Sequence, residues 1–147
     1  MLPIRLAQAA TLLFAFAHTA GMLNTAYRDD QERAAIERLQ AYVFPIMGVE
    51  RSHHDFYQGM GYGLSLFLAL SAFLLHQIAP LMAREPAASK SLLGGMSLAF
   101  VAMTVISSRW FFPAPIILSA VTALSLANAA LKLPSKSGPD QRPAQFS

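Results

Sequence analysis

Residues 50–63 read ERSHHDFYQGMGYG, and the apolar segment LSLFLALSAFLLHQI follows directly at 64–78. Ionisable side chains, among them Arg51 and Asp55, therefore stand at the start of a long apolar run. A helix needs about 20 apolar residues to cross a hydrocarbon core about 30 Å thick. The sequence predicts a membrane-spanning helix over 54–78, closed by Pro80, with ionisable groups crowded at one end.

The composition supports lipid as the solvent of this chain. Of the 147 residues, 54% are hydrophobic and 13% are charged, and the mean hydropathy is +0.41. Soluble domains carry about 25% charged residues, so charge is too scarce here to cover a soluble surface. The chain has no cysteine, which excludes disulfides, thiolate nucleophiles and cysteine-ligated metals. The net charge of +3 is spread over segment ends, which fits a membrane surface and argues against nucleic acid.

Three further apolar segments cover 3–23, 92–108 and 114–133, and a hydrophilic connection covers 81–91. We therefore predict an all-α fold, a four-transmembrane-helix bundle that forms one membrane domain over 1–133. Residues 134–147 are rich in Pro, Ser and Lys and are predicted to form a disordered tail.

The first segment has an alternative interpretation as a cleaved secretory signal peptide. Arg5 would be its basic end, and residues 15–17, Ala-Phe-Ala, its cleavage site. Against this, Gln8, Thr11 and His18 fall on one helical face, which a bundle helix needs and a signal peptide does not.

The longest polar region lies between the first two spans. Acids and bases alternate over 27–38, while Ile36, Leu39 and Met47 recur near helical spacing. We expect a short extramembrane amphipathic helix over 31–44, ended by Pro45 and Gly48. It would be a connecting helix on the membrane surface, or alternatively a lid over a site.

The basic residues set the expected orientation. With four spans, the side that holds the termini and the 81–91 loop carries six Lys or Arg residues, and the other side carries five. The shorter segments on the first side have the denser basic bias, so we expect both termini in the cytoplasm and a bacterial inner-membrane location.

Helical spacing places Arg51, Asp55, Gln58 and Tyr62 on one face of the second span. In a helix, Arg51 and Asp55 would form an i, i+4 ion pair. Glycines 59 and 63 form a small-xxx-small pair on another flank, where a neighbouring helix could approach closely.

The topology brings side chains from three spans to one depth, near the outer leaflet. Ionisable groups inside spans cost about 2.5–3.5 kcal/mol each and normally face the protein interior or a wet cavity. The candidate ligand-binding residues are His18, Arg51, His54, Asp55, Gln58, Tyr62 and Arg109. A position of His18 within about 4 Å of Asp55 or Tyr62 around a cavity would favour binding or catalysis. A His18 bonded to backbone would instead be a packing residue, and Asp55 could be a structural ion-pair partner. No metal-ligand spacing is present, so we expect no metal site.

The block R-x-x-x-D-F-Y-x-G-x-G at 51–61, with His18 and Gly21 in the first span, resembles a group of small uncharacterised bacterial four-span membrane proteins. The layout is also loosely similar to the DoxX-like four-helix family, whose members are associated with redox and quinone-linked partners. The first resemblance implies no activity, and neither resemblance assigns a cofactor. The four-span sterol-isomerase-like bundle is a further comparison of layout, but its paired acidic residues within the spans are missing here.

Three functional hypotheses follow. The chain binds a lipid-like or quinone-like small molecule between helices, or it is a membrane-embedded enzyme that does acid/base chemistry on a lipophilic substrate, or it is a structural subunit that packs against a membrane protein partner. No nucleophile–base pair and no phosphate-binding loop is evident, so the sequence favours the first and third hypotheses and reveals no reaction.

Overall fold

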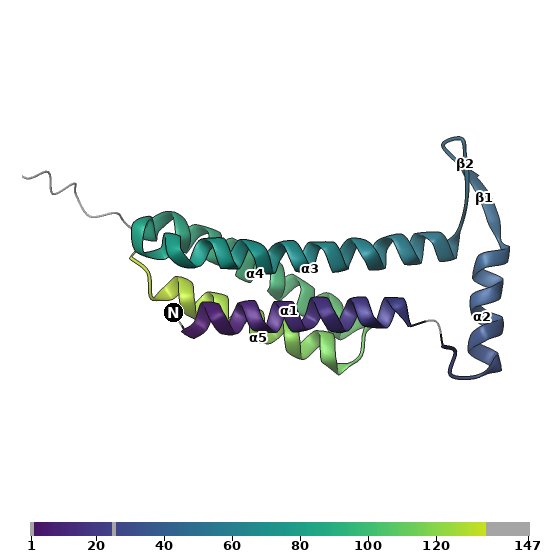
Figure 1. Ribbon diagram of the computed structural model, residues 1–147, viewed down its shortest axis with the longest axis horizontal. Coiled ribbons are helices and arrows are strands. Elements are labelled where there is room, and N and C mark those ends of the chain that lie inside the picture. Colours follow the sequence, from purple (N-terminus) through teal and green to yellow (C-terminus); the bar gives the residue numbers. More distant parts are fainter. Residues whose placement is uncertain (1, 25, 135–147) are drawn as a thin grey trace, which may run out of the picture. The chain divides into compact units, whose positions relative to one another are not determined.

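The computed structural model describes residues 2–24 and 26–134, which form five helices and one two-stranded hairpin (Figure 1). The elements are α1 Leu2–Leu23, α2 Asp30–Ala41, β1 Val43–Ile46, β2 Val49–Ser52, α3 His53–Arg84, α4 Pro86–Trp110 and α5 Pro113–Leu131. Helices α1, α3, α4 and α5 are long and apolar enough to cross a membrane, as in a multi-pass membrane protein. The predicted all-α class, with a short helix between the first two spans, is confirmed. Apart from its first residue, the predicted tail lies outside the described residues.

Proline sets two of the helix starts. Pro86 and Pro113 each occupy the first turn of their helix, where the missing amide has no intrahelical partner anyway. The predicted loop over 81–91 is wrong, because α3 runs to Arg84 and α4 starts at Pro86, which leaves Glu85 alone between them. The prediction that Pro80 closes the span is also wrong, since Pro80 lies inside α3. Pro80 removes one backbone hydrogen bond, and a helix tolerates that loss close to its end.

Helix α2 ends three residues earlier than predicted, because a β-hairpin follows it. Helical structure ends at Ala41, and the branched and aromatic run Val-Phe-Pro-Ile forms β1. The turn consists of Met47 (φ 49°) and Gly48 (φ 84°), both left-handed, as a two-residue hairpin turn of the primed type requires. The cross-strand pairs run from Ile46–Val49 beside the turn to Val43–Ser52.

The chain divides into two compact units. The hairpin unit is Ala15–Ala69, with the end of α1, then α2, the hairpin and the start of α3. The α4–α5 unit comprises the described residues before and after it, 2–14 and 70–134.

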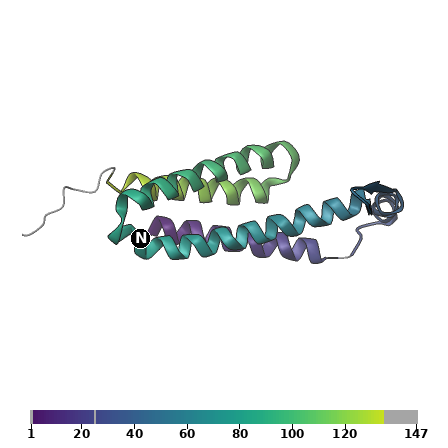
Figure 2. The same ribbon diagram turned by 90° about the horizontal axis from the view of Figure 1, so that it is seen from above.

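Hydroxyl groups hold the α4–α5 unit together. Helices α4 and α5 lie side by side (Figure 2). Ser97 donates to the carbonyl of Ala123 (2.9 Å), and the hydroxyls of Thr104 and Ser119 are 2.9 Å apart. Thr11 of α1 approaches Thr122 of α5 at 3.5 Å. Small hydroxylated residues are typical of helix interfaces in lipid, where close approach and hydrogen bonds replace the hydrophobic driving force.

Large apolar side chains cover the outside of these helices. Leu98 and Leu124 are each 72% exposed, although they lie in the middle of α4 and α5. Hydrocarbon solvates such side chains at no cost, so the exposed surface is the one that a lipid-embedded helix presents.

We predict that Ser119 contributes to the pairing of α4 and α5. Ser119→Ala removes the partner of Thr104, and interhelical hydrogen bonds in membranes contribute about 0.6 kcal/mol on average and up to about 1.7 kcal/mol. Ser119→Leu should cost more, about 1–3 kcal/mol, because this side chain is fully buried and has no room for extra methylenes. Thermal unfolding in mild detergent, followed by circular dichroism, measures both variants.

Ser108→Ala is the matched control, because within the described residues the exposed Ser108 hydroxyl bonds to the Val105 carbonyl of its own helix and to no other helix. A melting temperature unchanged by Ser119→Leu would contradict the role assigned to this interface.

Candidate functional site

Helix α3 begins with a reciprocal hydrogen-bonded cap. The hydroxyl of Ser52 accepts from the amide of Asp55 (3.2 Å), and Asp55 Oδ2 accepts from the amide (2.7 Å) and the hydroxyl (3.0 Å) of Ser52. This is a capping box, in which an N-cap serine and an acid three residues later satisfy each other's backbone donors. The helix dipole also favours a negative charge in the first turn. Asp55 is therefore engaged in starting the helix.

The predicted ion pair between Arg51 and Asp55 is wrong. Arg51 lies in β2, so the i, i+4 geometry of a helix does not apply to it. Its guanidinium donates instead to the backbone oxygen of Glu50 (2.7 Å), and no ion pair joins Arg51 to Asp55 in the described part of the chain.

His18 joins α1 to α3 through the backbone. Its Nε2 lies 3.1 Å from the carbonyl oxygen of Gly61, which can only accept, so Nε2 carries the proton of this bond. One turn further along α1, Met22 covers the same glycine, and a methyl group added at Gly61 would overlap the Met22 side chain. Gly61 is thus the close-approach residue. A Cβ built at Gly59 or Gly63 would meet no neighbouring atom within 4 Å in the described structure, so the packing predicted for this pair stays a prediction for a partner helix.

A cavity of about 420 Å³ lies where the end of α1, the linker with α2 and the start of α3 meet. Small-molecule sites commonly have volumes of about 300–1,000 Å³, so this cavity is large enough for one. Its polar lining comes from Asn24, Arg28, Glu32, Gln40, His54 and Gln58. His18 does not line it.

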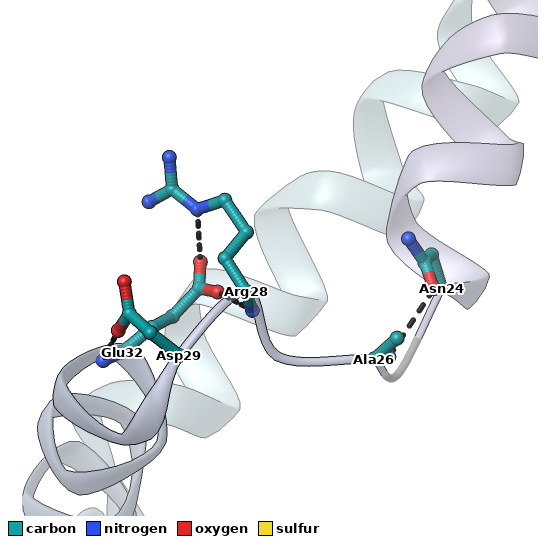
Figure 3. Close-up of polar contacts among 5 residues, drawn as sticks. All are labelled: Asn24, Ala26, Arg28, Asp29 and Glu32. Atoms are coloured by element: carbon teal, nitrogen blue, oxygen red, sulfur yellow. Dashed lines mark hydrogen bonds and ion pairs between the residues drawn. The ribbon is translucent and has the colours of Figure 1, made fainter.

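The linker wall of this cavity is ordered by its own hydrogen bonds (Figure 3). The side chain of Asp29 accepts from the amide of Glu32 (2.8 Å), and Glu32 accepts from the amide of Arg28 (2.6 Å). The Arg28 guanidinium also pairs with Glu32 (3.4 Å), while Asn24 accepts from the amide of Ala26 (3.2 Å). Helix α2 therefore starts with an acid-capped turn, and this turn holds the linker against the cavity.

The α3 wall carries unpaired polar atoms. His54 Nε2 lies 3.4 Å from Gln58 Nε2, one turn further along the helix. The Gln58 amide nitrogen donates in this contact, so His54 Nε2 accepts and the imidazole proton is on Nδ1. His54 Nδ1 and Gln58 Oε1 are buried and have no hydrogen-bond partner within the described residues. Such an atom costs about 1–3 kcal/mol unless a water or ligand satisfies it.

A second cavity of about 330 Å³ lies on another side of the same helix end. It is lined by Arg51, Asp55, Phe56, Gly59 and Met60. The structure thus separates the predicted site residues into two groups, with His54 and Gln58 at the first cavity and Arg51 and Asp55 at the second.

The remaining predicted residues lie outside both groups. Tyr62 is 47% exposed and lines neither cavity. Arg109 is exposed in the last turn of α4 and belongs to the α4–α5 unit. The cavity residues that sequence reasoning missed lie mainly on the linker and α2. The pattern Asp29-x-x-Glu32 is a capping signature that could have indicated an ordered linker there.

Over the described residues, no group of three His, Cys, Asp or Glu side chains could hold a metal ion. No protein-family model, curated protein or solved structure matches the chain.

We predict that His18 acts through packing. His18→Leu removes the bond to Gly61 and should lower the unfolding free energy by about 0.6–1.7 kcal/mol, the range of interhelical hydrogen bonds in membranes. Melting in detergent measures this loss, and His18→Gln, which keeps a side-chain donor, should recover part of it. A His18→Leu variant that melts like the wild type would contradict the prediction.

We also predict acid-sensitive order in the linker. The Arg28 backbone amide, which donates to Glu32, lowers the pKa of Glu32 below its ordinary value, and the guanidinium contributes less. This stabilisation is present above the ordinary glutamate pKa and is lost as the pH falls through the lowered folded value. Carboxyl ¹³C NMR titration of labelled glutamate measures it.

Two variants separate the causes of this lowering. Arg28→Ala keeps the backbone donor and should keep most of the lowering, whereas Arg28→Pro removes the donor and should return the pKa of Glu32 toward its ordinary value. Complete loss of the lowering in Arg28→Ala would contradict the backbone assignment.

Proposed function

We propose that the hairpin unit binds the polar head of a lipid-like or quinone-like small molecule in the 420 Å³ cavity, near the outer leaflet. The observation that carries this proposal is the pair of buried atoms without partners, His54 Nδ1 and Gln58 Oε1, beside that cavity. The cost of leaving them unpaired is removed when a bound head group supplies their partners.

The lining matches a head group that carries acceptor oxygens. His54 Nδ1 from α3 and Asn24 from the linker can each donate a hydrogen bond, and Arg28 adds a positive charge. Gln58 Oε1 is an acceptor, and a hydroxyl of the head group would be its donor. The carbonyls of a quinone and the ester or phosphate oxygens of a lipid are acceptors of this kind. The layout similarity to DoxX-like proteins agrees with the quinone alternative.

The neighbouring surface suits an apolar tail. Tyr57 lines the cavity and is 57% exposed, and Met60, one turn deeper in α3, is 69% exposed. A tail that leaves the cavity between these side chains would run along the apolar flank of α3 in lipid.

We infer a bacterial inner-membrane location with both termini in the cytoplasm. The denser basic bias of the segments on the side of the termini supports this orientation. It places the hairpin unit at the outer face, where a molecule of the outer leaflet would reach the cavity.

Assembly with another membrane protein is a second candidate function. Gly59 and Gly63 are both uncovered, so the small face that they form on α3 is open to a helix from a partner chain. A third alternative is an acid/base enzyme, in which His54 at the cavity would donate a proton to a lipophilic substrate or accept one from it.

The test is purification of the full chain in mild detergent, followed by native mass spectrometry and solvent extraction. We expect a bound lipophilic molecule at stoichiometric occupancy, and the mass and redox absorbance of the extract distinguish a quinone from a lipid. His54→Ala and Gln58→Ala should each lower the occupancy several-fold.

His76→Ala is the matched control, because this exposed histidine lies in the same helix but lines neither cavity. Full occupancy in both cavity variants would refute the site. A mass increase that corresponds to a second polypeptide, without a small molecule, would favour assembly.

A further inference from the structure

The β-hairpin has two chemically different faces. The cross-strand pairs Phe44–Arg51 and Ile46–Val49 place these four side chains on one face, here called the apolar hairpin face. The pairs Val43–Ser52 and Pro45–Glu50 form the opposite face. The apolar hairpin face therefore carries one arginine and no acid, whereas the opposite face carries Glu50.

The apolar hairpin face is directed toward the first turn of α3, next to the membrane-spanning part of this helix. The ring of Phe44 stacks on the ring of Phe56, with centroids 6.0 Å apart and planes within 4° of parallel. Phe56 lies one turn into α3 and is itself 43% exposed. The apolar hairpin face is thus continuous with the exposed surface of the span. Its Arg51 shares the second cavity with Phe56 and Met60.

The outer part of the hairpin is uncovered. Met47 at the turn is 99% exposed, and Val49 and Ile46 are 47% and 38% exposed. In Figure 1 the hairpin runs across the end of α3 rather than along its axis. It therefore projects sideways at the depth where α3 begins.

The length of α3 sets that depth. Its 32 residues extend about 48 Å at about 1.5 Å per residue, whereas a bilayer with its head groups is about 40–45 Å thick. A helix that spans the hydrocarbon core through its apolar residues 60–79 leaves its first turns in the head-group layer. The hairpin leaves the helix at that layer, through Ser52.

We propose that the β-hairpin is a lipid-contact element that lies on the head-group layer with its apolar face toward the bilayer. Phe44, Ile46 and Val49 contact the interface, and Arg51 binds lipid phosphate from the same face. Apolar and aromatic side chains beside a basic residue are the composition that membrane interfaces favour. A bilayer fits better than a protein partner because the apolar hairpin face is directed at the span from which the hairpin emerges.

The test uses the absence of native cysteine. Met47→Cys and Glu50→Cys are labelled separately with an environment-sensitive fluorophore, and the full chain is reconstituted in vesicles of phosphatidylcholine and phosphatidylglycerol. Half of the vesicles contain a lipid with a nitroxide on its head group. We expect a blue-shifted label at position 47 that is quenched several-fold more strongly than the label at position 50.

Val49→Cys is a second reporter, because it lies on the apolar hairpin face outside the left-handed turn and is expected to behave like position 47. Equal quenching at positions 47, 49 and 50 would overturn the proposal. A blue shift at 47 that persists without lipid in detergent and grows with protein concentration would also overturn it, in favour of contact with a second copy of the chain. Neither outcome depends on whether the 420 Å³ cavity holds a ligand.

Discussion

The reciprocal hydrogen bonds between Ser52 and Asp55 fix the residue at which the chain changes from strand to membrane-length helix. The first four amides of any helix lack intrahelical acceptors, so side chains or water must accept their hydrogen bonds. The side chain of Ser52, in β2, accepts from the amide of Asp55, and the side chain of Asp55, in α3, accepts from the amide of Ser52. This cap also sets the helical register of His54 and Gln58, so both reach the same cavity. The geometry of the candidate site therefore depends on the hydrogen bonds between Ser52 and Asp55, although neither residue lines the 420 Å³ cavity.

The two units use polar groups in different ways. In the α4–α5 unit the hydroxyls of residues such as Ser97, Thr104 and Ser119 bond to the neighbouring helix or to their own, so little hydrogen-bonding capacity is left over. In the hairpin unit, buried atoms of His54 and Gln58 stay unpaired. The hydrogen-bonded hydroxyls of the α4–α5 unit serve helix packing. Buried polar atoms without partners, as in the hairpin unit, are typical of functional sites.

Much of the architecture could be predicted from the sequence, because apolar length alone identifies a membrane span. The helices of the first and fourth spans match their predicted bounds within two residues. The hairpin is not predicted from the sequence, because Pro45 and Gly48 also end a helix, and only the first of the two strands, Val-Phe-Pro-Ile, is an apolar run.

The prediction of the site was weaker, because it extended a helical period back to Arg51, which lies in a strand. It also assigned Asp55 to a ligand, although serine three residues earlier made Asp55 the natural partner of an N-cap. The cavity wall on the linker and α2 depends on contacts between segments distant in sequence, and no local period encodes those.

The single residue between α3 and α4 restricts how the chain can enter a membrane. One residue extends about 3.6 Å at most, so the end of α3 and the start of α4 stay together whenever both are helical. Neither helix can lie fully across the bilayer while the other remains far from it in the aqueous phase. During synthesis the two would have to be inserted as a helical hairpin, with Glu85 at its tip. Their relative orientation in the membrane is then decided in one step rather than two.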